Sequence, residues 1–169
     1  MGLPHKLKDM NLFDNGFSYL GLVPEVTLPK ITLKTEAYRG GGMLAEVDVA
    51  MGLEKLEMEI KYGGAVRNKL RSLGLAGVNG SLMRWLGAYQ EDATGAVLAA
   101  EVVAQGLLTE LDPGSAKVGD NTEWTAKHTL IYYKLVIGGV EEIEIDVLNN
   151  VWRVGVVDRM ADIRAALQQ

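Results

Sequence analysis

The chain has 169 residues, of which 48% are apolar and 23% charged, with a formal net charge of −5 and no cysteine. This length and composition predict one globular domain spanning 1–169. The lack of cysteine excludes disulfides and thiolate zinc sites, and the acidic balance argues against specific nucleic-acid binding. No apolar run is long enough for a membrane span or a signal peptide, so we expect a protein made in the cytoplasm.

Two β-hairpins are predicted first along the chain. Asn15-Gly16 lies between short apolar and aromatic runs, which is the strongest local signal for a tight hairpin. Residues 26–62 predict a much longer hairpin, because two strand-like arms flank Gly40-Gly41-Gly42, and glycine accepts the backbone of a tight turn. The apolar parity changes within 52–55, which predicts a bulge or short turn there. The arms exceed the usual strand length, so we expect part of this hairpin to reach beyond its own domain.

The rest of the chain predicts more strands and two short helices. Residues 65–75 place Val66, Leu70 and Leu73 on one helical face, and residues 158–169 predict a C-terminal helix capped by Asp158. Between them, strands are predicted at 81–89, 97–111, 122–137 and, with an acidic face, around 142–147. The sequence therefore predicts a mainly β fold, a small β-sandwich or barrel with a long β-hairpin and one or two short flanking helices.

The sequence shows no pattern of catalytic or metal-binding residues. The two histidines, His5 and His128, lie in no metal-binding spacing, and a lone histidine in a strand is usually a surface or core residue. The acidic residues follow alternating strand rows, where contact with solvent explains them better than acid–base chemistry. The glycine run joins two strands, so it offers no helix N-terminus to a phosphate. We therefore predict no enzymatic activity, no cofactor and no metal.

Several motifs are shared with one known family. The most specific is Lys34-Thr35-Glu36-Ala37-Tyr38-Arg39-Gly40-Gly41-Gly42-Met43. Others are Asn11-Leu12-Phe13, Glu110-Leu111-Asp112-Pro113-Gly114, Tyr132-Tyr133-Lys134-Leu135 and Glu144-Ile145-Asp146. With these motifs, nearly the whole chain resembles the major tail tube proteins of contractile-tailed bacteriophages and of phage-tail-like bacteriocins such as R-type pyocins. Two places depart from the family pattern, Gly155-Val156-Val157-Asp158 and the final Leu167-Gln168-Gln169.

The resemblance implies that six copies close into a ring and that rings stack into the inner tube of a contractile tail, a conduit for DNA or ions. The long hairpin is then the element that contacts the neighbouring subunit or ring. Its expected contact residues are Lys34, Thr35, Glu36, Tyr38, Arg39, Gly40, Gly41, Gly42 and Met43.

The resemblance also implies a channel wall and a surface for the tail sheath. Acidic side chains on the wall would repel phosphate, and the candidates are Glu142, Glu144 and Asp146, with Glu57 and Glu59 as substitutes. A merely solvated face explains the same carboxylates equally well. The candidate sheath contacts lie on the basic side of the 65–75 helix and are Arg67, Lys69 and Arg71.

The partners that the resemblance implies are further copies of the chain, the sheath, the baseplate and tail terminator proteins, the tape measure protein and passing DNA. The expected location is the virion tail, after assembly in the host cytoplasm. One alternative is the tube of a type VI-like secretion system. Another, from a different class, is a monomeric ligand-binding β-barrel, which requires a cavity lined by convergent polar groups. The sequence does not distinguish a phage from a bacteriocin.

Overall fold

A computed structural model describes residues 2–169, and within them the chain forms twelve strands and two short helices. The first six strands are β1 (Lys6–Asp14), β2 (Phe17–Ser18), β3 (Glu25–Thr27), β4 (Leu33–Tyr38), β5 (Val47–Leu53) and β6 (Leu56–Tyr62). The remaining elements are α1 (Arg67–Ser72), β7 (Ser81–Gln90), β8 (Val97–Asp112), β9 (Trp124–Ile137), β10 (Val140–Asp146), β11 (Val151–Val154), β12 (Val157–Asp158) and α2 (Ala161–Leu167). Neither helix is long and apolar enough to cross a membrane.

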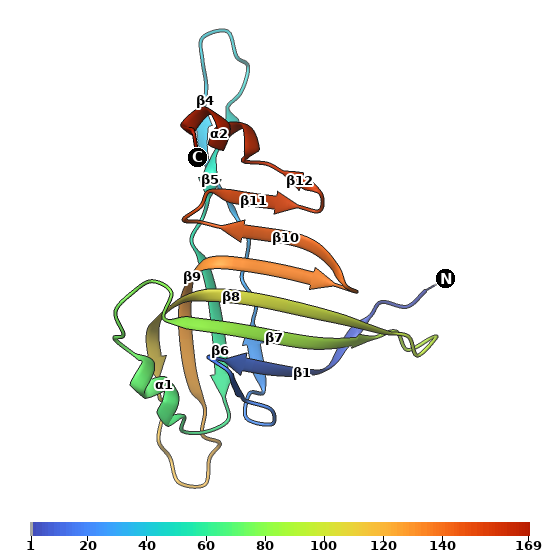
Figure 1. The fold of residues 1–169 in the computed structure, drawn as a ribbon, viewed down its shortest axis with the longest axis vertical. Helices are drawn as coiled ribbons and strands as arrows, with labels where there is room; N and C mark the ends of the chain where they lie inside the picture. The colour runs from blue at the N-terminus through green and yellow to red at the C-terminus, as the bar shows by residue number, and fades with distance from the viewer. Residues whose placement is uncertain (1) are drawn as a thin grey trace.

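The main sheet has ten strands and forks at β9 (Figure 1). One edge of β9 pairs with β8 along most of its length. The other edge pairs with β6 over 124–130 and with β10 over 132–137. From the fork, one branch continues through β10, β11 and β12, and the other continues through β6 to β3. Strands β7, β1 and β2 extend the sheet beyond β8, while β4 and β5 form a separate two-stranded sheet.

The long strands β8 and β9 bend where the sheet forks. Their register shifts between Gln105 and Gly106, opposite the stretch from Leu130 to Tyr132. At this bend Gly106 lies directly against the carbonyl oxygen of Thr129 and the Cα atom of Leu130, so any side chain would collide with backbone. A glycine inside a strand at such a close approach permits the bend.

The core is one cluster that the alternating residues of several strands share. In β6 the even-numbered residues are buried, as the period of a half-buried strand requires. On β8 the small residues Ala100 and Ala104 are buried beside Val102, and Trp85 on β7 packs in the same cluster. Burying each large apolar side chain contributes about 1.5–3 kcal/mol.

The twelve strands and two short helices confirm the predicted mainly β fold with short flanking helices. The predicted tight turn is also confirmed, because β1 and β2 pair on either side of Asn15 and Gly16, which both have positive φ.

Both helices differ in detail from the prediction. Helix α1 is shorter than 65–75, and the face assigned to it is wrong, because Leu70 is 57% exposed while Lys69 is 1% exposed. Helix α2 begins only at Ala161, and no side chain caps it. Asp158, predicted as its cap, ends β12 instead. Its carboxylate accepts the backbone N–H of Met160 and forms a 2.6 Å ion pair with Arg164.

Candidate assembly interface

Strands β4 and β5 form an arm that projects from the body of the molecule. Within residues 2–169 they pair only with each other, and the arm extends past α2 at one end of the long axis (Figure 1). Every residue of β4 is exposed, as is β5 up to Gly52. A two-stranded sheet of this kind is marginally stable alone, and both of its edges offer unpaired backbone groups to another strand.

The arm continues a hairpin whose base belongs to the body. At the base, β3 pairs with β6, and the ladder then breaks at 28–32 and at Glu54-Lys55 before β4 and β5 pair. A register shift lies opposite Lys34, where Gly52 has a φ of +109°, and this bulge turns Leu53 toward the core while Met51 stays outside. The bulge at Gly52 therefore explains why the apolar residues change from odd to even positions within 52–55.

One face of the arm carries an apolar strip, defined here as Tyr38, Val47, Val49 and Met51. Tyr38 pairs with Val47, and Val49 pairs with Glu36, so these side chains share one face of the two strands. Tyr38 is 60% exposed and Met51 is 55% exposed. Large apolar side chains gathered on a projecting element mark an interaction surface, because a free subunit gains nothing by exposing them.

The glycine tip of the arm is a compact turn. The backbone N–H of Met43 donates to the carbonyl of Gly40 at 3.3 Å, and the Arg39 Nε donates to the carbonyl of Met43 at 3.3 Å. Among the three glycines only Gly42 has a positive φ, +84°. The nine predicted contact residues thus lie along β4 and at the tip of the arm, and all but Gly40 and Met43 are exposed.

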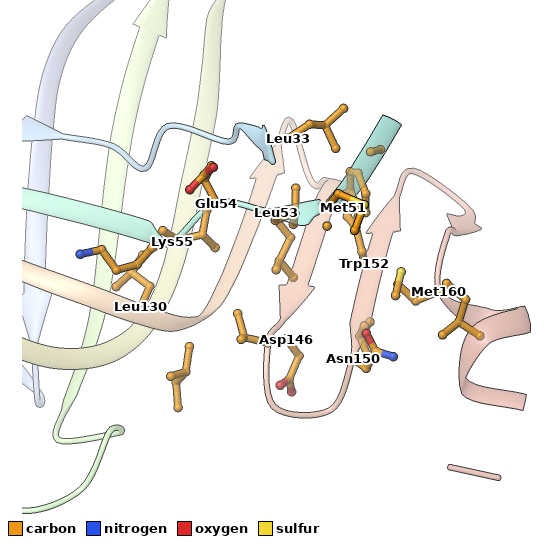
Figure 2. A pocket seen from close by; sticks show the side chains of 18 of the residues that line it. Leu33, Met51, Leu53, Glu54, Lys55, Leu130, Asp146, Asn150, Trp152 and Met160 are labelled. Atoms are coloured by element: carbon orange, nitrogen blue, oxygen red, sulfur yellow. The ribbon is translucent and has the colours of Figure 1, made fainter. Parts of the chain in front are cut away.

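A groove of about 790 Å³ lies where the arm meets the body, inside the fork of the sheet. Figure 2 shows its apolar lining, with Met51 and Leu53 from the arm, Leu130 from β9, and Trp152 and Met160 from the C-terminal part. The indole N–H of Trp152 has no hydrogen-bond partner among the described residues. Met51 belongs both to the strip and to the lining of the groove.

The polar groups of the groove do not converge on one point. Glu54 and Lys55 lie at one end of the groove, whereas Asp146 and Asn150 lie at the opposite side (Figure 2). The oxygens of Asp146 already accept the backbone N–H groups of Leu148 and Asn149 and the Asn149 amide. A small-molecule site normally presents a few convergent polar groups, so this lining favours a macromolecular contact.

The predicted wall carboxylates lie on two branches of the sheet, and four of the five engage partners within the chain. On β10, Glu144 accepts the Tyr132 hydroxyl at 2.8 Å and the Arg153 guanidinium at 2.7 Å, and Asp146 holds the following turn. Burial and the hydrogen bond to Glu144 raise the pKa of Tyr132. Glu142 is exposed beside a register shift.

The two substitute candidates lie on β6. Glu57 forms a 2.8 Å ion pair with Lys55, which lowers the pKa of Glu57, and Glu59 lies 3.9 Å from Lys127. Three of the five predicted carboxylates, Glu57, Glu59 and Glu144, therefore lie beside a basic side chain, which partly neutralises their charge.

The predicted sheath contacts divide into two exposed residues and one buried residue. Arg67 and Arg71 are exposed on α1. Lys69 is wrong as a surface contact, because its ammonium is buried in an ion pair with Asp14 and lies 3.3 Å from His128 Nε2. Asp14 and His128 lie at alternate positions of β1 and β9 that the sequence pattern marks as buried. Two polar residues at such positions could have indicated a buried partner for them. The groove residues gave no such signal, because they come together only through the fork.

The fold matches that of chains found in contractile injection systems. A chain of the sheath–tube complex of the PVC extracellular contractile injection system aligns with a TM-score of 0.57 at 13% identity, covering 79% of this chain and 91% of that one. A chain of the anti-feeding prophage baseplate aligns with a TM-score of 0.53 at 12% identity, covering 80% and 97%. These likenesses show that the chain has a fold found in components of contractile injection systems.

The family follows from the sequence itself. The model described as Phage tail tube protein FII matches residues 4–167, and the chain belongs to this family. It is 42% identical over 167 residues to the tail tube protein of Escherichia phage P2, covering 97% of each chain. It is 37% identical over 155 residues to the major tail tube protein of Serratia phage KSP20, covering 90% of this chain and 89% of that one. The predicted relationship to tail tube proteins is confirmed, and the protein is a structural component of tubes.

Proposed function

We propose that six copies of this chain close into a ring and that stacked rings form the inner tube of a contractile tail. The observation that carries this proposal is the projecting arm, with two free edges and an apolar strip that shares Met51 with the groove. An arm on one side of a subunit that binds a different surface of the next makes a head-to-tail contact, which generates rings or filaments. The proposed contact residues are Lys34, Thr35, Glu36, Tyr38, Arg39, Gly40, Gly41, Gly42 and Met43, and we add the exposed strip residues Val47, Val49 and Met51.

The proposed tube encloses a channel that conducts DNA or ions. Carboxylates on the wall repel phosphate and keep a passing strand from adhering. The wall candidates are Glu142, Glu144, Asp146, Glu57 and Glu59. A reconstruction of the assembled tube tests this assignment directly, and it is refuted if these carboxylates face the exterior or lie buried between rings.

The proposed partners are the sheath around the tube, the baseplate and terminator at its ends, and the tape measure protein and DNA within. Related chains occur in sheath–tube, terminator and baseplate complexes of injection systems. We place the protein in the virion tail after assembly in the host cytoplasm, and we propose that it has no enzymatic activity. A type VI-like tube shares this architecture, whereas the groove lining argues against a monomeric ligand-binding barrel.

The exposed arginines of α1 provide a test of sheath docking. We expect Arg67→Glu together with Arg71→Glu to leave tubes intact and to weaken sheath binding about tenfold, because charges at the rim of an interface steer association. The measurement is co-sedimentation of sheath protein with preformed tubes at low and high salt. Lys6→Glu together with Lys117→Glu replaces two exposed lysines outside α1 and makes the same change of −4 in net charge, so this double variant is the control. Unchanged sheath binding by the double variant would remove α1 from the sheath interface.

A further inference from the structure

Helix α1 lies in a segment with glycine at both ends. Gly63 and Gly64 precede it, and Gly74 and Gly77 follow it with φ of +83° and +100°. No strand pairing ties any part of 63–80 to the sheets. Glycine accepts wide changes of φ and ψ without steric penalty, so both ends of this segment can act as hinges.

Apolar packing contributes little to holding this segment in place. Leu70 and Leu73 point to solvent, and Val66 alone packs against the core as a partly buried residue. A cleft of about 260 Å³ lies beneath the start of the helix, between residues 63–68 and the loop at Tyr19 and Leu22. A segment with few buried apolar contacts and a cleft beneath it needs only a small free energy to open locally.

A buried polar cluster fastens the segment. The Lys69 ammonium pairs with the Asp14 carboxylate of β1, and Lys69 Nζ lies 3.3 Å from His128 Nε2 on β9. All three side chains are almost fully buried. One oxygen of Asp14 and the Nδ1 of His128 have no hydrogen-bond partner among the described residues, so the cluster is only partly satisfied.

We propose that residues 63–80 form a hinged flap that the Lys69–Asp14–His128 cluster fastens, and that the flap opens as a unit while the β body stays folded. The inference concerns the subunit itself and does not depend on the proposed tube. Closure requires a neutral His128, because its Nε2 lies 3.3 Å from the Lys69 ammonium, which would repel a second cation. The Asp14 carboxylate is engaged by the same ammonium. Acid is therefore the condition that releases the flap.

The direction of the pH effect follows from His128. Burial and the neighbouring Lys69 lower the pKa of His128 from 6.5 to about 3, so between these values the open form binds more protons and opening becomes easier as pH falls.

Limited trypsin digestion of the full-length protein at neutral pH tests whether the Lys69–Asp14–His128 cluster holds the flap closed. Lys69→Met leaves Asp14 buried without its partner, and we expect cleavage after Arg67 and Arg71 at least tenfold faster than in the wild type. Asp14→Asn with Lys69→Met removes both charges, and the rate should return to within a few-fold of the wild type. Lys55→Met, which removes an exposed lysine, should have no effect on these two sites.

Hydrogen exchange tests whether lower pH opens the flap, and this test does not need the Lys69→Met variant. After correction for intrinsic exchange rates, opening of 63–80 in the wild type should increase at least tenfold between pH 7 and pH 5. His128→Gln keeps an acceptor without a titrating ring, and it should abolish this increase. The proposal is overturned if 63–80 exchanges only with the body strands, or if its opening is independent of pH in the wild type.

Discussion

A subunit with Val49→Asp should fold normally and fail to form tubes. Val49 is exposed on the free subunit, so the aspartate meets water and stability should change by less than about 0.5 kcal/mol. In the tube that we propose, a neighbouring subunit covers the arm strip, and an unpaired buried carboxylate there is strongly unfavourable. We expect the protein concentration needed for assembly to rise at least roughly 100-fold, equivalent to about 3 kcal/mol. Pelleting of tubes measures assembly, and circular dichroism confirms folding.

A matched control separates the effect of the arm from that of added charge. Val118 is a fully exposed valine in the loop between β8 and β9, away from the arm. Val118→Asp changes the same residue type and the same net charge, so we expect normal tubes. Normal assembly of Val49→Asp would show that the strip stays open to solvent and that the arm does not form the contact.

Gly106→Ala should lower the free energy of unfolding by about 3 kcal/mol, because overpacking a close backbone approach forces the strands apart. The new Cβ atom would press on the carbonyl of Thr129 and on the Cα of Leu130, and neither can move without disturbing the β8–β9 ladder. The bend and the fork should both be affected, since Leu130 also lines the groove. Urea denaturation of the soluble subunit measures the change.

Gly41→Ala serves as the comparison for this substitution. A Cβ atom at Gly41 meets nothing within 4 Å, and its φ is not positive, so its stability should stay within about 0.5 kcal/mol of the wild type. A Gly106→Ala protein as stable as Gly41→Ala would mean that the bend relaxes easily and that the strands are not held by this close approach.

The sequence predicted features that depend on local alternation and turn residues. The β6 strand, the Asn15-Gly16 turn and the parity change near Gly52 follow from side-chain period and from glycine conformations, which act over a few residues. The acidic wall was less predictable, because whether Glu144 is free depends on Arg153 and Tyr132 in neighbouring strands.

The features that escaped prediction depend on contacts between distant residues. Helix α1 has only six residues, so its apolar stripe gives a weak signal, and the burial of Lys69 is decided by Asp14 and His128. The groove forms only because β6 and β10 leave β9 at the same place. A single sequence contains no direct sign of that fork.

Electron microscopy of the purified protein at rising concentration, with the Val49→Asp variant beside it, tests whether the arm joins subunits into a tube. We expect six-membered rings and hollow tubes for the wild type, with density of each arm lying on an adjacent subunit, and dispersed subunits for the variant. Wild-type protein that remains monomeric at high concentration, or tubes in which the arms project freely into solvent, would contradict this role of the arm.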